Sequence, residues 1–250
     1  MPFSRDIWEK TWKDTYNGLG SIPFIRQYGS DGQHYAGYNW INGREIRVFK
    51  EPKVAVKVVH PIVDALKNLI DEIGLDIQVN YFGNDSTLNR QIEKYTSQDN
   101  YRKVGGSPVK LLDGDSLSRE LLTEDWRKYK PHADVIITDK YLKLGTENWG
   151  QSQFSLGTEI ISLPDRRQDA LEFIYNISKH EGEHLIGYNQ HHDSNKVTGY
   201  KEPSDCLMYW KASTDRLCNK CKNATVFFWE GAKDRMNDTF FEKQPILILQ

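Results

Sequence analysis

Long apolar runs, an excess of basic residues and a set of paired cysteines are all missing from this sequence. No stretch approaches the roughly 18 consecutive apolar residues that span a bilayer, and the first residues are too polar for a signal peptide. The formal net charge of -2 over 250 residues gives no electrostatic footprint for nucleic acid. Three cysteines are an odd number, which is a poor basis for a disulfide framework. We therefore expect a cytoplasmic globular protein without a nucleic-acid or membrane partner.

Strand-like and helix-like periodicities alternate along most of the chain, which favours an α/β layer architecture. The segments expected as strands are 53–59, 76–82, 133–139 and 157–164. The segments expected as helices are 62–74, 117–129 and 166–187, the first and the last of which end at a glycine. The polar stretch 84–117 is ambiguous.

The chain changes character near residue 52. Aromatic residues are dense before this point, and apolar periodicity is weak. Within "YAGYNWINGREIRVF" the pair Asn42-Gly43 supplies the positive φ angles of a tight turn, which predicts a β-hairpin. We expect residues 1–52 to form an N-terminal extension with this hairpin and residues 53–250 to form the main domain.

Four of the seven histidines lie in one stretch, "KHEGEHLIGYNQHHD" (179–193). His180 and His184 are four residues apart on a predicted helix, so both imidazoles project from one face. Such a pair suits a zinc ion, with the neighbouring Glu181 placed to take a proton from the zinc-bound water. Gly182 costs this helix about 1 kcal/mol of propensity without a visible reason. Glu183 is interpreted as solvated or as lying behind the ligands.

A third ligand is expected just past Gly187, where the chain can double back beneath the metal. The motif H-E-x-x-H-x-x-G followed by histidine resembles the metzincin clan of zinc endopeptidases. That clan has its third histidine three residues after the glycine, where this chain has Gln190. His191 is one residue late; we prefer it to Gln190, because a neutral amide oxygen is a weaker zinc ligand.

The stretch "DCLMYWKASTDRLCNKC" narrows the resemblance to the archaemetzincins. Their third histidine precedes a zinc-binding cysteine, a Cys-x-Met element and a Cys-x-x-Cys pair. Cys206-Leu207-Met208 and Cys218-x-x-Cys221 match the last two, and His192 stands where the first cysteine would fall. The resemblance covers residues 133–221, and residues 53–82 fit the family's opening β-α-β less specifically.

This resemblance implies a metzincin-like α/β (α+β) fold with a mixed twisted sheet, an active-site helix and a small C-terminal subdomain. The upper subdomain would be 53–187, the lower one 188–250, and the strand 158–163 would be the sheet edge that binds a peptide substrate. Two zinc ions are implied for each chain, a catalytic and a structural one. His180, His184 and His191 would hold the first, and His192, Cys206, Cys218 and Cys221 the second, with Met208 as a hydrophobic floor.

The function expected is therefore that of a zinc metallopeptidase with Glu181 as general base, acting on a peptide or protein. Three alternatives stay open. The protein could be a non-catalytic zinc-stabilised module that binds peptides or regulates a partner. The cysteines could form a zinc-ribbon-like interaction element with the helix motif accidental, or Cys218 and Cys221 could be a redox dithiol.

Overall fold

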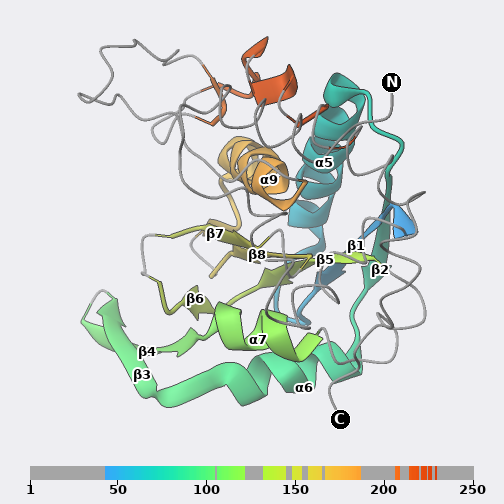
Figure 1. Ribbon diagram of the computed structural model, residues 1–250. Coiled ribbons are helices and arrows are strands. Elements are labelled where there is room, and N and C mark those ends of the chain that lie inside the picture. Colours follow the sequence, from blue (N-terminus) through green and yellow to red (C-terminus); the bar gives the residue numbers. More distant parts are fainter. Residues whose placement is uncertain are drawn as a thin grey trace, which may run out of the picture.

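A computed structural model gives the fold of the chain (Figure 1). The structure describes residues 43–104, 106–121, 132–144, 148–153, 157–164, 167–186, 206–208, 214–219, 221–223, 225–226 and 229. No helix in these ranges is long and apolar enough to cross a bilayer.

A five-stranded mixed sheet forms the centre of the molecule, in the order β2-β1-β5-β8-β7. Its strands are β1 (Glu45–Lys50), β2 (Gln78–Gly83), β5 (Ala133–Thr138), β7 (Gly150–Gln153) and β8 (Thr158–Ser162). The pairs β2-β1, β1-β5 and β5-β8 are parallel, and β7 is antiparallel to β8. A second sheet, in the order β3-β4-β6, consists of β3 (Thr96–Val104), β4 (Ser107–Leu112) and β6 (Tyr141–Leu142).

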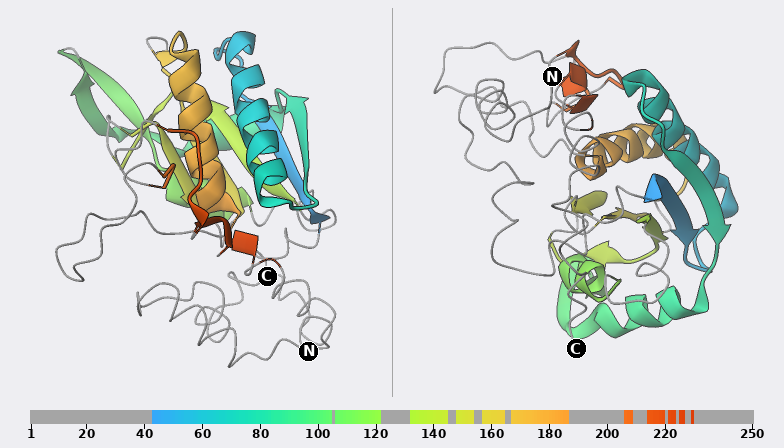
Figure 2. Two further views of the ribbon diagram at one scale, coloured as in Figure 1. Left: turned by 90° about the horizontal axis from the view of Figure 1, so that it is seen from above. Right: turned by 45° about the vertical axis from the view of Figure 1, so that its right-hand side comes forward.

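Helices cover both faces of the five-stranded sheet (Figures 1 and 2). They are α5 (Val59–Ile73), α6 (Ser86–Tyr95), α7 (Gly114–Leu121) and α9 (Leu171–Leu185), with a short 3-10 turn η2 (Val56–Val58) before α5. Helices α5 and α9 lie side by side on one face, and α6 and α7 lie on the other. The α/β fold class expected from the sequence is confirmed.

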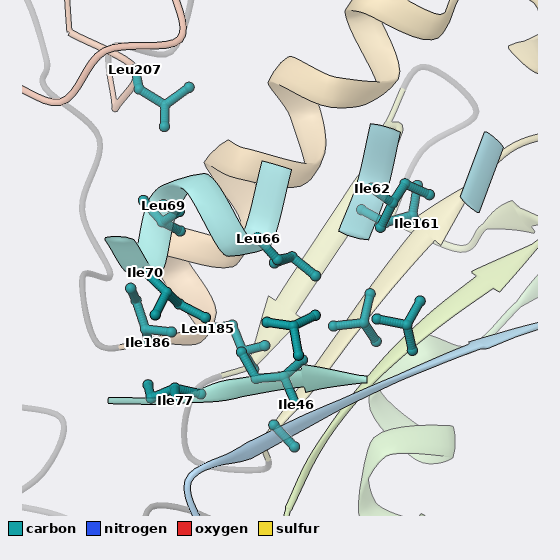
Figure 3. Packing of buried hydrophobic residues seen from close by; sticks show 14 of the residues in the cluster. Ile46, Ile62, Leu66, Leu69, Ile70, Ile77, Ile161, Leu185, Ile186 and Leu207 are labelled. Atoms are coloured by element: carbon teal, nitrogen blue, oxygen red, sulfur yellow. The ribbon is translucent and has the colours of Figure 1, made fainter. Parts of the chain in front are cut away.

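Each face of the sheet buries its own apolar cluster. Figure 3 shows the larger one, in which Ile46 and Ile161 of the sheet meet Leu66 and Leu69 of α5 and Leu185 of α9. On the opposite face, sheet residues such as Ile136 and Ile160 pack with α6 and α7. Strand β5 is buried at every position, which explains its largely apolar sequence "ADVIIT", although two polar residues, Asp134 and Thr138, are buried in it as well.

Several predicted elements are confirmed, namely β2, β5, β8, α9 and α5, whose cap Gly74 has a left-handed φ of 82°. The strand predicted at 53–59 is wrong, because residues 56–58 form the turn η2 and α5 starts at Val59. Alternating valines there satisfy a strand pattern, but Val56 is 69% exposed and has no place in the sheet.

The prediction that residues 45–49 form one arm of a hairpin is also wrong. They belong to β1, whose two sides are occupied by the parallel strands β2 and β5. The first strand of the main sheet thus precedes the predicted boundary at residue 52, because a parallel strand and a hairpin arm carry the same local alternation. The rest of the predicted extension, residues 1–42, lies outside the described residues.

The predicted edge strand is corrected as well. Strand β8 lies between β5 and β7, so it is an interior strand, and β7 is the last strand on that side of the described sheet.

Candidate metal and catalytic site

Helix α9 carries the histidine motif and has two unlike faces. Ile174 and Leu185 are buried in the same cluster as residues of α5, and Gly182 lies against Leu66 and Leu69 of that helix. Phe173, at 46%, is exposed, and it shares a stripe of helical spacing with Ile177, His180 and His184, which are half-buried. The neighbouring apolar residues Phe173 and Ile174 thus differ, because Ile174 lies in the core and Phe173 does not.

His180 and His184 lie next to each other on this stripe. Their ring centroids are 4.9 Å apart, and the rings are nearly perpendicular, at 82°. Nδ1 of His180 is 2.8 Å from the carbonyl oxygen of Leu207. Because a carbonyl oxygen only accepts, Nδ1 carries the proton, and Nε2 keeps the lone pair that a metal ion needs.

Glu181 lies over the edge strand β7. A Cβ added at Gly150 would fall 2.8 Å from Cδ and 2.9 Å from Oε1 of Glu181, so only glycine leaves room for this carboxyl group. The hydroxyl of Ser152, two residues along β7, donates to the main-chain oxygen of Glu181 at 2.8 Å. Burial raises the pKa of the Glu181 carboxyl to about 7, against the lowering effect of Ser152.

Gly182 explains why α9 and α5 can approach so closely. A Cβ at this position would fall 2.7 Å from Cδ2 of Leu66 and 3.1 Å from Cδ2 of Leu69. Both leucines are fully buried (Figure 3). Glycine lowers the helix propensity of α9 at this position, but it allows the two helices to pack closely.

A carboxyl group that sequence reasoning missed lies beneath this helix. Glu159 of β8 is fully buried, and neither of its oxygens has a hydrogen-bond partner among the described residues. Burial, with the nearby Glu181 carboxylate adding to it, raises the pKa of Glu159 well above its ordinary value. The only signal in the sequence was an acidic residue inside the apolar run "TEIIS".

The three cysteines form a compact cluster. The Sγ atoms of Cys206, Cys218 and Cys221 all lie within 4.8 Å of one another, and those of Cys206 and Cys221 are 3.7 Å apart. A tetrahedral zinc site with Zn–S bonds of about 2.3 Å has S···S edges of about 3.8 Å, which this cluster fits. None of the three forms a disulfide, and the backbone N–H of Cys218 donates to Sγ of Cys206 at 3.3 Å. The adjoining sulfurs and burial raise the pKa of Cys221, so its thiolate needs a nearby cation.

Of the two interpretations given for Glu183, solvated or lying behind the ligands, burial excludes the first. It is fully buried, and its Oε1 accepts a hydrogen bond from the hydroxyl of Thr225, in the segment that carries the cysteines. Burial raises the pKa of Glu183 to about 8, although the Thr225 hydrogen bond opposes the shift. Met208, expected as a hydrophobic floor, is fully buried in the same cluster as α5 and α9.

The structure thus brings together His180, His184 and Glu181 at α9, and the three cysteines close by. Gly187, Gln190, His191 and His192 lie outside the described residues.

The sequence matches no protein-family model, and no curated protein matches it. Three similar solved structures are those of archaemetzincin from Methanopyrus kandleri, a zinc-dependent peptidase from Methanocorpusculum labreanum, and archaemetzincin from Archaeoglobus fulgidus complexed with malonate. The first is 15% identical, with 76% of this chain and 95% of that chain covered and a TM-score of 0.49. The second and third are 16% and 15% identical, each with 72% of this chain and 99% of the other covered and with TM-scores of 0.43 and 0.45.

Two of these three structures are archaemetzincins, the family that the histidine motif and the cysteine spacing of this chain resemble. With all three TM-scores below 0.5 the likeness is distant, and the assignment of function rests on the residues of this chain.

Proposed function

We propose that the protein is a zinc-dependent peptidase. The observation that carries the proposal is the arrangement on α9. His180 and His184 share one face, the hydrogen bond from Nδ1 of His180 to the Leu207 carbonyl places the lone pair of this imidazole on Nε2, and Glu181 lies against the last strand of the described sheet, β7. A carboxylate beside two imidazoles, together with the last strand of the described sheet, supplies a base, a metal site and a place for an extended peptide.

The chain's own residues would act as follows. A zinc ion held by the histidines would supply a Lewis acid that polarises the scissile carbonyl and lowers the pKa of a bound water. Glu181 accepts a proton from the attacking water and passes it to the leaving amine. Strand β7 binds the substrate backbone by main-chain hydrogen bonds. It takes the place of residues 158–163, which the family resemblance had implied as the substrate-binding edge. Gly150 keeps the space above β7 that Glu181 occupies.

Two ligand sets belong to the proposal. His191 completes the histidine site, with Gln190 as the alternative. His192 joins Cys206, Cys218 and Cys221 in a second zinc site, which stabilises the fold rather than taking part in chemistry. Support for the second site comes from the spacing of the three sulfurs. The substrate would be a peptide or protein.

The experiment compares the zinc-loaded wild type with Glu181→Gln on a library of fluorogenic peptides. Wild type should hydrolyse members of the library, a hydroxamate should inhibit it, and Glu181→Gln should retain both zinc ions without hydrolysis. Ser86→Ala, at the exposed start of α6, is the control and should leave the rate unchanged. A rate in Glu181→Gln equal to that of wild type would remove the mechanism. Two bound zinc ions without hydrolysis of any peptide would favour the non-catalytic binding module instead.

A further inference from the structure

The segment that carries the cysteines is hydrogen-bonded to α9 at several points along the second half of the helix and at its C-terminal cap. Lys179 donates through Nζ to the carbonyl oxygen of Asp215 at 2.7 Å and pairs with Glu72 of α5 at 2.7 Å. His180 contacts the Leu207 carbonyl, and Glu183 contacts Thr225. Near the end of the helix, the indole N–H of Trp229 donates to the carbonyl oxygen of Ile186 at 2.7 Å. Of these contacts, the one from Leu207 reaches a candidate metal ligand.

Leu207 is held in place by its neighbours. It directly follows Cys206, its backbone N–H donates to the carbonyl oxygen of Arg216 at 2.6 Å, and its side chain is buried (Figure 3). Arg216 is two residues before Cys218, whose N–H reaches Sγ of Cys206. The Leu207 carbonyl is therefore positioned by the loops that bring the three sulfurs together.

We propose that a metal ion in the three-cysteine cluster holds the Leu207 carbonyl against Nδ1 of His180, so that the two metal sites are thermodynamically coupled. Leu207 acts as a positioning residue through its main chain. This inference rests on the proposed function, because it assigns His180 to a metal site. It differs from that proposal in giving the cysteine cluster an effect on the histidine site as well as on folding.

The physical reason is the difference between sulfur contacts and metal–sulfur bonds. Without an ion, Cys206 is linked to the other two cysteines by a sulfur–sulfur contact at 3.7 Å and one N–H···S hydrogen bond at 3.3 Å, both weak. A metal ion bonded to the three thiolates would hold Cys206 in place, and with it the carbonyl group of the next residue, Leu207. A hydrogen bond to the remote nitrogen of a ligating imidazole sets its tautomer and orientation, and its loss typically lowers metal affinity about 10-fold to 100-fold. Coupling of this kind is reciprocal.

The first test uses the unmodified full chain. One equivalent of Cd²⁺, which prefers thiolates, is added to the reduced metal-free protein, and the imidazole nitrogens are followed by ¹⁵N NMR. Cadmium NMR verifies that the ion is bound by sulfur. We expect the Nδ1 proton of His180 to exchange more slowly with solvent when cadmium is bound, although the ion binds elsewhere, because its hydrogen bond to the Leu207 carbonyl is held more firmly. An unchanged exchange rate of the Nδ1 proton of His180 would overturn the inference.

The second test measures the affinity of the histidine site for Co²⁺, from its visible absorption, in the presence of one equivalent of Cd²⁺. Cys218→Ser should weaken this affinity about 10-fold or more relative to wild type. Trp229→Phe is the matched control, because it removes the hydrogen bond between the same segment and the carbonyl of Ile186 and leaves both partners of the Leu207–His180 contact in place. Equal weakening in both variants would indicate general destabilisation and overturn the coupling.

The two proposals fail in different ways. If the wild type binds no Co²⁺ with an imidazole-type spectrum, the proposed function fails and the coupling fails with it. If the wild type binds Co²⁺ with the same affinity as Cys218→Ser, only the coupling fails.

Discussion

Gly182→Ala should destabilise the protein although alanine is the better helix former. The substitution gains about 1 kcal/mol of helix propensity. Its Cβ would lie 2.7 Å from Leu66 Cδ2 and 3.1 Å from Leu69 Cδ2, in a core where both leucines are fully buried. Overpacking of this kind costs about 1–3 kcal/mol, so we expect a net loss of about 1 kcal/mol in the free energy of unfolding.

The sign should reverse when the obstructing side chain is removed. In a Leu66→Ala background, Gly182→Ala should stabilise by about 1 kcal/mol, since the propensity gain remains and the new methyl group enters a cavity. Ile70→Ala is the matched control background. Ile70 is buried on α5, as Leu66 is, but it is not among the nearest contacts of Gly182. Urea denaturation at fixed zinc concentration measures the wild type, the three single variants and the two double variants. A stabilising Gly182→Ala in the wild-type background would refute the close approach of α5 and α9.

Three further predictions concern the site. Gly150→Ala should lower kcat at least 10-fold with zinc content unchanged, because its Cβ displaces Glu181; an unchanged kcat would contradict the position of this carboxyl. Cys218→Ser should lower both expression and total zinc, and full stability with two metals per chain would count against the second site. Glu159→Gln should flatten the pH dependence of the free energy of unfolding. Because the pKa of Glu159 is raised in the folded protein, its contribution to stability is fully present below about pH 4.5 and declines as pH rises toward the folded-state pKa. Parallel pH profiles for wild type and variant would contradict this.

Elements with a strong local signal could be predicted from the sequence. Helix α5 has apolar residues at helical spacing and a terminal glycine, and β5 is a short, largely apolar run. The resemblance to the archaemetzincins implied that the three cysteines share one site, and their sulfurs do cluster.

Features that depend on distant partners could not be predicted. The alternation in residues 45–49 is the same for a hairpin arm and for the parallel strand β1, and only pairing with β2 and β5 distinguishes them. The position of β8 inside the sheet depends likewise on β7. Gly182 is needed because of leucines more than a hundred residues earlier in the chain, which leave no room for a side chain. The buried Glu183 accepts its hydrogen bond from Thr225, in a later segment.

The number of zinc ions bound per chain tests the central claim most directly. Elemental mass spectrometry on the purified, reduced protein should give two for wild type and one for a variant with both His180→Ala and His184→Ala. One zinc ion in the wild type, retained in full by that double variant, would show that the α9 histidines hold no metal and would contradict the account.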